Sequence, residues 1–249
     1  MEYKTIRVNW VRKICYIQLY RPEDNNTISS EMIEEILQVL QQCEKEANII
    51  VIEGTPEIFC FGADFKEVLS GERDDKCAEK LYMLWKKIAA GPYISIAHVK
   101  GKVNAGGIGF VAACDIAIAD HTATFSLSEL LFGLYPACVL PFLIRRIGYQ
   151  KAHYFTIMTQ PVDVKKAYEW GIVDAYDERD DDLLRRHLLR LERLPKSGIC
   201  DYKTYICQVN NNFIEAEENA TKANQAMFTK QQNIQWIKQF VELGKFPWQ

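Results

Sequence analysis

The sequence predicts an α/β fold, because short apolar segments with strand periodicity alternate with segments of helical periodicity over the first two thirds of the chain. The strand-like segments are residues 5–10, 14–20, 49–52, 94–99, 115–119 and 124–127. From Pro141 onwards almost every segment has helical period instead. We therefore expect an α/β core over residues 1–190 and a C-terminal helical region over residues 191–249.

The elements of the first part follow from local patterns. Residues 5–10 and 14–20 alternate apolar and polar side chains around a short basic turn, which predicts a hairpin. Ser30 is a candidate N-cap for a helix that follows, with acidic residues in its first turn. Residues 49–52 are a short buried strand, and residues 64–69 begin a second helix.

The middle of the chain repeats this order. A polar loop precedes helical residues 81–89, the strand at 94–99 leads into the glycine-rich turn 101–107, and residues 108–113 begin a buried helix. Asp163 is the expected N-cap of a later helix that ends at Gly171.

Composition excludes several classes of protein. The 249 residues are 48% hydrophobic with a formal net charge of −3, so neither disorder nor a nucleic-acid surface is expected. No apolar span reaches the roughly 20 residues that a bilayer requires, and no secretory signal is present, so we expect a cytoplasmic protein without a membrane partner. The eight cysteines are scattered singly, which disfavours zinc and a disulfide framework and favours reduced core thiols. No cofactor is expected.

Two glycine-containing turns stand where a strand passes into a helix: Phe61-Gly62-Ala63-Asp64 and Asn104-Ala105-Gly106-Gly107. The first N–H groups of a helix have no intrahelical acceptor, and small residues let a ligand oxygen approach them. Two such N–H groups converging on one oxygen would form an oxyanion hole, which stabilises a thioester enolate or a tetrahedral intermediate. The alternative is that both are tight turns required only for packing.

The ordered segments FCFGADF, GKVNAGGIGFVAACDIAIAD, FSLSELLFGLYP and AYEWGIVD resemble the crotonase (enoyl-CoA hydratase/isomerase) superfamily. The resemblance implies a spiral of ββα repeats with C-terminal helices that assemble trimers, which often pair into hexamers. It also implies that the N–H groups of Ala63 and Gly106 form the oxyanion hole. Ala105 replaces the first glycine of the family's triplet, which is a small change.

The resemblance also places two catalytic glutamates beside the thioester in hydratases of this family. One falls on Gly109 of this chain, so that carboxylate is absent, and the other falls on Glu129. Burial would raise the pKa of Glu129 toward the range useful for proton transfer. The alternative is a first-turn glutamate after Ser128, satisfied by backbone N–H groups.

A single acid/base suits the loss of a tertiary hydroxyl, whose carbon tolerates positive charge, and so suggests a branched 3-hydroxyacyl thioester. The same segments resemble the dehydrating hydratase-like enzymes of polyketide β-branching cassettes. That resemblance implies a hydro-lyase that converts 3-hydroxy-3-methylglutaryl-acyl-carrier protein to 3-methylglutaconyl-acyl-carrier protein. Three alternatives remain: a decarboxylase of the glutaconyl product, an enoyl-CoA hydratase/isomerase, and a trimeric binding or scaffold protein with a degenerate site.

Several further residues are candidates for contacts with the substrate. Asp64 and Gly107 belong to the two turns, although Asp64 more simply caps the next helix, and Tyr82 and Tyr135 would line the acyl pocket. His98 lies in an apolar strand-like segment and is expected to be a core residue. The candidates for holding the phosphate of a phosphopantetheine arm are Arg21, Lys66, Arg145, Arg146 and Lys245.

Overall fold

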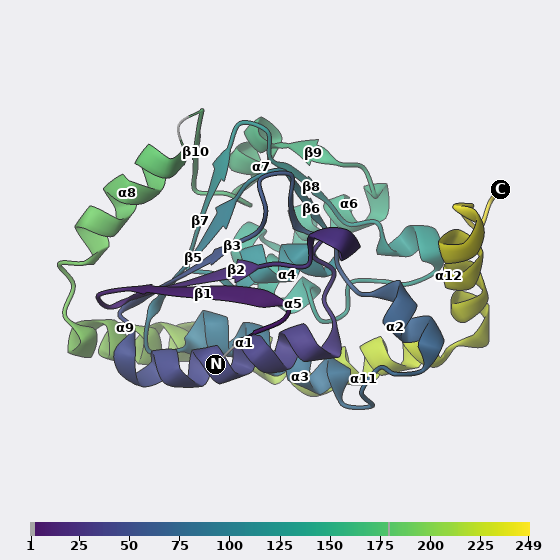
Figure 1. Ribbon diagram of the computed structural model, residues 1–249, viewed down its shortest axis with the longest axis horizontal. Helices are drawn as coiled ribbons and strands as arrows, with labels where there is room; N and C mark the ends of the chain where they lie inside the picture. Colours follow the sequence, from purple (N-terminus) through teal and green to yellow (C-terminus); the bar gives the residue numbers. More distant parts are fainter. Residues whose placement is uncertain (1–2, 179) are drawn as a thin grey trace.

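The fold is built on two sheets that exchange strands along the chain (Figure 1). It is seen in a computed structural model that describes residues 3–178 and 180–249. The larger sheet contains, in spatial order, β1 (Ile6–Val11), β2 (Ile14–Leu19), β3 (Ile49–Glu53), β5 (Ile94–Val99), β7 (Ile116–Asp120) and β10 (Ala175–Asp177). The smaller sheet contains β4 (Ile58–Cys60), β6 (Lys102–Asn104), β8 (Thr124–Ser126) and β9 (Val162–Asp163).

From β3 to β8, consecutive strands alternate between the sheets, which makes this part of the chain a spiral. β3, β5 and β7 are parallel neighbours in the larger sheet, and the strand after each of them, β4, β6 and β8, is a parallel neighbour in the smaller one. The first two of these pairs are each followed by helix, which gives the ββα repeat expected from the sequence. Antiparallel strands occur at the edges, where β1 pairs with β2 and β8 pairs with β9.

The helices follow the repeats and then dominate the last third of the chain. They are α1 (Ser30–Glu46), α2 (Phe65–Ser70), α3 (Cys77–Ala90), α4 (Gly106–Ala113), α5 (Leu140–Ile147), α6 (Tyr149–Met158), α7 (Val164–Trp170), α8 (Asp180–Leu191), α9 (Lys196–Val209), α10 (Asn212–Glu215), α11 (Glu217–Thr229) and α12 (Gln231–Leu243). Two 3₁₀ turns, η1 (Pro22–Asp24) and η2 (Glu129–Phe132), complete the elements.

Both faces of the larger sheet are covered, which explains why β3 reads as a continuous apolar run. Ile50 and Ile52 belong to the main core beneath α1 and α3, whereas Ile49 and Val51 face α8 through its Leu184. Six of the eight cysteines are buried and all eight are free thiols, as the scattered spacing predicts.

The C-terminal helices pack on the core of their own chain. Phe213 of α10 contacts Phe142 of α5 with ring centroids 5.4 Å apart, α11 lies along α3, and α12 lies beside α2 (Figure 1). The division at residue 190 and a role of this region in assembly therefore stay predictions, while its packing on the core is observed.

Three local expectations differ from the structure. The N-cap of α1 is Ser29, whose hydroxyl accepts a hydrogen bond from Met32 N–H at 3.2 Å, and Ser30 is the first helical residue. Residues 102–104, expected within a turn, form β6 because the smaller sheet supplies partners on both sides. The helix expected at residues 81–89 extends over Cys77–Ala90. The cap and stop residues of α7, Asp163 and Gly171, are confirmed.

Candidate active site

The two glycine-containing turns lie against each other at the ends of β4 and β6. Gly62 has a φ of +90°, a conformation that side chains other than glycine rarely adopt. A Cβ atom added to Gly62 would lie 2.7 Å from Cβ of Ala105 and 3.2 Å from the nitrogen of Gly106. The close approach of the two backbones therefore explains why both turns consist of small residues.

The hydrogen bonds of the first turn orient the N–H of Ala63. Ile28 N–H donates to the carbonyl of Gly62 at 2.7 Å, and Asp64 N–H donates to the carbonyl of Ile28 at 3.2 Å. Because C=O and N–H of a trans peptide point in opposite directions, Ala63 N–H points away from Ile28. Gly106 is the first residue of α4, so its N–H has no acceptor within the helix. This geometry is suited to an oxyanion hole.

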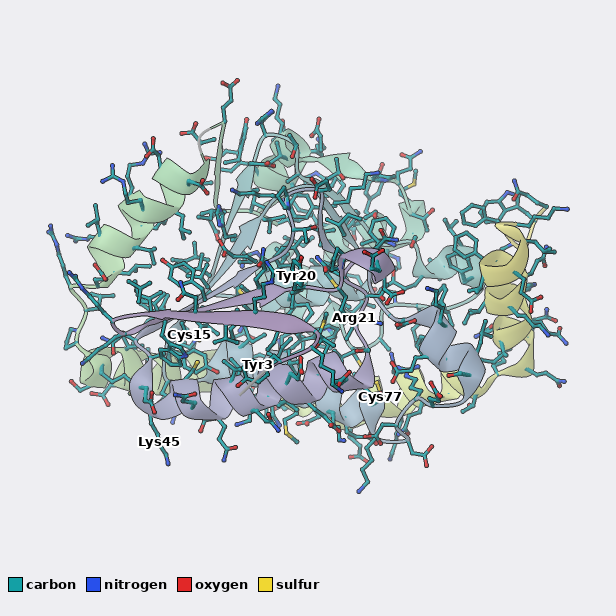
Figure 2. The ribbon with its side chains drawn as sticks, viewed as in Figure 1. Tyr3, Cys15, Tyr20, Arg21, Lys45 and Cys77 are labelled. Carbon is teal, nitrogen blue, oxygen red and sulfur yellow. The ribbon has the colours of Figure 1, made fainter. Side chains whose placement is uncertain are left out.

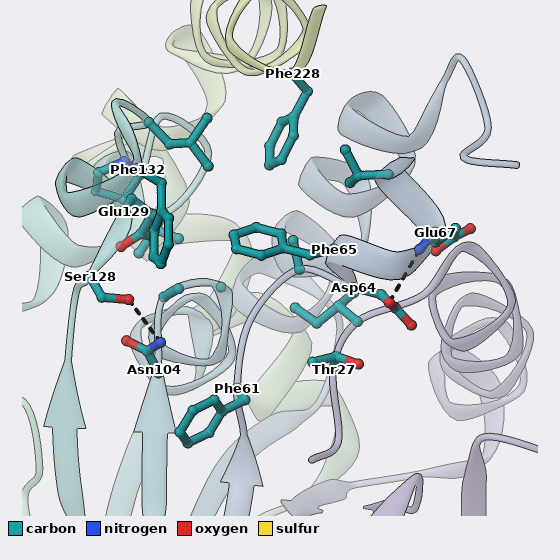
Figure 3. Close-up of a pocket in the computed structure, with 18 of the residues that line it drawn as sticks. Thr27, Phe61, Asp64, Phe65, Glu67, Asn104, Ser128, Glu129, Phe132 and Phe228 are labelled. Carbon is teal, nitrogen blue, oxygen red and sulfur yellow. Dashed lines mark hydrogen bonds between the residues drawn. The ribbon is translucent and has the colours of Figure 1, made fainter. Parts of the chain in front are cut away.

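Ala63 and Gly106 both line a cavity of about 650 Å³. Its wall is mainly apolar and is contributed by segments that are far apart in the sequence, as Figure 3 shows for Phe65, Phe132 and Phe228. Phe240 and Phe246, from α12 and the segment after it, close the same cavity near Phe132, with ring centroids 4.9 and 5.6 Å from that of Phe132. Such a volume and lining fit an acyl chain.

Glu129 lies in the wall of this cavity, at the start of η2 (Figure 3). Asn104 Nδ2 donates to Oγ of the preceding Ser128 at 2.9 Å, so this segment is tied to the turn that carries Gly106. The residue as a whole is half-buried, but its Oε2 atom is shielded from solvent and has no hydrogen-bond partner among the described residues. Burial raises the pKa of the Glu129 carboxyl to about 7. A carboxyl with this pKa is suited to accept and return a proton at neutral pH.

Gly109, the position at which the family resemblance places a second glutamate, has no room for a side chain. An added Cβ would lie 2.3 Å from Cζ2 and 2.5 Å from Cε2 of Trp85. The Trp85 indole packs edge-on against Phe110 and Phe142 and is itself part of the cavity wall. A tryptophan ring thus occupies the space beside Gly109.

Asp64 lines the cavity but is held by structural partners. Its Oδ1 accepts from the N–H groups of Lys66 and Glu67 at 3.0 and 3.3 Å, which makes it the N-cap of α2. Its Oδ2 pairs with the guanidinium of Arg21 at 2.8 Å, and Arg21 lies two residues after the end of β2 (Figure 2). The structural alternative for Asp64, a capping residue, is therefore confirmed.

The other sequence-predicted contacts divide into two groups. Tyr135 lines the cavity and is 42% exposed. Tyr82 is fully buried and donates to the carbonyl of Phe213 at 2.5 Å, so it belongs to the core and not to the acyl pocket. Gly107 is also outside the cavity lining, because an added Cβ would lie 2.4 Å from the carbonyl oxygen of Cys60. Close packing against β4, and not substrate contact, explains this glycine.

His98 is a core residue, as expected, with Nδ1 2.6 Å from a carboxylate oxygen of Glu53.

Most of the cations expected near a phosphopantetheine arm have structural roles. Arg145 donates to the carbonyls that end α4, and Arg146 donates to the carbonyls of Cys114 and Ile172, away from the cavity. Lys66 does line the cavity, is 73% exposed at its side chain, and pairs with Asp24. Lys245 is exposed and outside the cavity lining.

Sequence reasoning missed one cation in the cavity. Arg73, from the loop between α2 and α3, lines the wall with its guanidinium 4.0 Å from the ring centroid of Phe228 and 3.4 Å from Oδ1 of Asn224. No local pattern marks it, because it lies in a polar loop of mixed charge.

Within residues 3–178 and 180–249, no group of three or more His, Cys, Asp or Glu side chains is arranged to hold a metal ion. No helix in that part of the chain is long and apolar enough to cross a membrane.

The sequence profile of the enoyl-CoA hydratase/isomerase family matches residues 11–249, so the chain belongs to that family. It is 56% identical over 254 residues to the Bacillaene synthase dehydratase PksH of Bacillus subtilis, covering 100% of this chain and 98% of the relative. It is 30% identical over 183 residues to a hydroxycinnamoyl-CoA hydratase-lyase of Pseudomonas fluorescens, covering 70% and 66% of the two chains.

Solved structures agree with this assignment. The crystal structure described as the polyketide biosynthesis enoyl-CoA hydratase pksH of Bacillus subtilis superimposes with a TM-score of 0.95 at 55% identity, covering 99% of this chain and 100% of that one. An enoyl-CoA hydratase of Bacillus halodurans has a TM-score of 0.86 at 19% identity, covering 94% and 99%, and shows the shared fold. The crotonase fold and the expected enzyme class, a hydratase-like hydro-lyase, are confirmed.

Proposed function

We propose that this enzyme dehydrates a 3-hydroxy-3-methylglutaryl group on an acyl-carrier protein to a 3-methylglutaconyl group, as a step of β-branching in polyketide biosynthesis. The observation that carries the proposal is the Glu129 carboxyl, whose buried Oε2 lacks a partner among the described residues, in the same cavity wall as the paired turns, while Trp85 fills the space beside Gly109. Similarity to a dehydratase of bacillaene synthase supports the pathway.

In this proposal the reaction starts with the thioester carbonyl between the N–H groups of Ala63 and Gly106. The Glu129 carboxylate removes the proton from C2, and the electron pair of the C–H bond moves into the thioester enolate, whose oxygen the two N–H groups stabilise. The enolate then re-forms the carbonyl, the C2=C3 double bond forms and the C3–O bond breaks. The departing oxygen takes the proton back from Glu129, and water leaves.

A pKa of about 7 suits both halves of this cycle. A fully solvated glutamate would be a weaker base, and a carboxyl that stayed protonated at neutral pH would remove no proton. The tertiary C3 centre compensates for the absence of a second carboxyl, because its carbon accommodates positive charge as the hydroxyl departs.

The Arg73 guanidinium supports an acyl group with its own carboxylate. A cation within a mainly apolar cavity favours an anionic group at that end of the ligand, and the arginine fork matches a carboxylate. In this proposal the exposed Lys66, which lines the cavity, binds the phosphate of a phosphopantetheine arm. We propose an acyl-carrier protein as the partner that delivers this arm.

The test is to incubate the enzyme with carrier protein loaded with 3-hydroxy-3-methylglutaryl and to follow the intact carrier by mass spectrometry. Loss of one water, abolished in Glu129→Gln, is the expected result. The Arg73→Met variant should lower kcat/KM about 10-fold or more for this substrate and much less for an uncharged 3-hydroxyacyl group. Loss of carbon dioxide from a glutaconyl-loaded carrier would instead identify a decarboxylase, and turnover of CoA thioesters alone would exclude the carrier.

A further inference from the structure

Trp85 carries an unpaired hydrogen-bond donor inside the protein. Its indole is 1% exposed, and Nε1 is shielded from solvent without a partner among the described residues. Leaving a buried donor unpaired is unfavourable, so such a group calls for an acceptor that the free chain does not contain.

Other buried polar atoms in the described part of the chain also lack a hydrogen-bond partner. They are buried side-chain atoms without partners: Glu79 Oε2, Trp85 Nε1, Glu129 Oε2, Asn210 Oδ1 and Asn233 Oδ1. Trp85 Nε1 is the one nitrogen among these, and Trp85 and Glu129 line the same cavity. A buried donor and a buried carboxyl oxygen without partners thus belong to two residues of one cavity wall.

The position of the indole indicates which ligand atom it meets. Its Cε2 atom, bonded to Nε1, would lie 2.5 Å from a Cβ on Gly109, which is three residues after Gly106 on α4. Residues three apart on a helix are neighbours on one face, about 5–6 Å from each other. With the thioester oxygen at Gly106, a group one turn along the helix faces the substituents of C3.

Resting on the proposed function, we propose that Trp85 Nε1–H binds the substrate by donating a hydrogen bond to the C3 hydroxyl oxygen. The indole transfers no proton. It holds the oxygen toward Glu129 and partly stabilises the negative charge as the C3–O bond breaks. Trp85 thereby takes over the orienting role of a carboxyl at position 109 without its acidity.

The kinetic test compares Trp85→Phe with a protein carrying 3-benzothienylalanine at position 85, in which sulfur replaces the N–H at nearly the same ring shape. Both should lower kcat/KM for dehydration about 10–100-fold, the usual loss for one hydrogen bond made in the transition state. Exchange of the C2 proton of 3-methylglutaryl-CoA, which lacks the hydroxyl, should change less than about 2-fold. Trp170→Phe is the matched control, because Trp170 packs against Phe155 outside the cavity.

A spectroscopic test is independent of turnover. In ¹⁵N-tryptophan-labelled Glu129→Gln protein, the Nε1–H resonance that Trp85→Phe removes should shift on addition of 3-hydroxy-3-methylglutaryl-CoA and much less with 3-methylglutaryl-CoA. An unresponsive resonance, or dehydration by Trp85→Phe within about 2-fold of the parent, overturns the inference while leaving the proposed function intact. If the resonance responds but the parent enzyme does not dehydrate the thioester, the proposed function is wrong and the binding role of Trp85 stands.

Discussion

At the scale of single residues, the environment of Glu129 sets the chemistry of the site. Its carboxyl lies in a mainly apolar wall, and no described residue forms an ion pair with it that would favour the charged form. Desolvation is therefore the main cause of the raised pKa of Glu129. The same desolvation of the charged carboxyl also affects the stability of the fold.

The rate should follow the ionisation of this carboxyl. Because the base must be deprotonated to remove the C2 proton, kcat/KM should rise about tenfold per pH unit below its pKa of about 7 and then level off. The measurement is a series of initial dehydration rates between about pH 5 and 8.5. A rate that is already nearly level from about pH 5 upward, as a carboxyl with the ordinary glutamate value of 4.5 would give, would show instead that the carboxyl is solvated.

The same shift predicts that Glu129 destabilises the fold above acidic pH. Its pKa is raised in the folded state, so the folded protein binds more protons than the unfolded chain between pH 4.5 and about 7, and stability falls with pH over this window. At pH 8 the penalty is on the order of 3 kcal/mol. Glu129→Gln should therefore raise the urea midpoint at pH 8 and leave it nearly unchanged at pH 4.

The control for this stability measurement is Glu57→Gln at an exposed site. Equal midpoints for Glu129→Gln and the parent at both pH values would argue against a desolvated carboxyl at position 129.

At the scale of elements, α2 depends on the residue that precedes it. Asp64 caps the helix through two backbone N–H groups and neutralises the largely buried Arg21. Since α2 carries Phe65 into the cavity, the cap also positions part of the acyl wall.

Asp64→Ala should lower the free energy of unfolding by about 2–4 kcal/mol, because the cap is lost and Arg21 keeps only Asp24 as an ion-pair partner. Asp64→Asn retains a side-chain oxygen for capping and should cost less. Urea denaturation measures both. A large loss of kcat in Asp64→Ala without loss of stability would assign Asp64 to the reaction itself.

The sequence predicts elements better than it predicts which distant side chains meet. Buried runs such as Ile49–Glu53 and caps such as Asp163 are local signals, and they identified strands and helix ends closely. The N-cap of α1 was displaced by one residue because two serines adjoin, and either hydroxyl satisfies the pattern.

The side chains that sequence analysis misplaced or missed are determined by tertiary packing. Tyr82 and Trp85 lie on one helix, and nothing local distinguishes the tyrosine that bonds to Phe213 from the tryptophan whose donor stays unpaired. The contact between Trp85 and Gly109 joins residues 24 positions apart, and Arg73 packs in the cavity wall against Phe228 of the distant helix α11. Burial and contacts between residues far apart in the sequence decide these roles, and periodicity does not encode them.

At the scale of the whole molecule, α9 presents apolar side chains that the chain itself does not cover. Tyr202, Tyr205 and Val209 are each more than 60% exposed and lie three or four residues apart, which places them on one helical face. An apolar face of this kind is typical of an association surface.

We therefore predict that the protein forms the trimer or hexamer that the family resemblance implies, and that α9 contributes to the contact. Light scattering coupled to size exclusion should give about three or six times 28.8 kDa. The double change Tyr205→Glu and Val209→Glu should reduce the mass, whereas Thr204→Glu, at another exposed position of α9, should not. A monomeric parent protein would contradict this prediction.

The close packing of the Trp85 ring on Gly109 constrains how this sequence diversifies. Replacing the glycine alone by glutamate would drive the new side chain into the indole, so the single mutant would be misfolded or inactive before it gained a second acid. The ring must shrink first, at the expense of the core contacts with Phe110 and Phe142. Lineages of this enzyme are thus separated from two-acid hydratases by an epistatic barrier of at least two ordered substitutions, and laboratory evolution toward hydration should recover changes at position 85 before any at position 109.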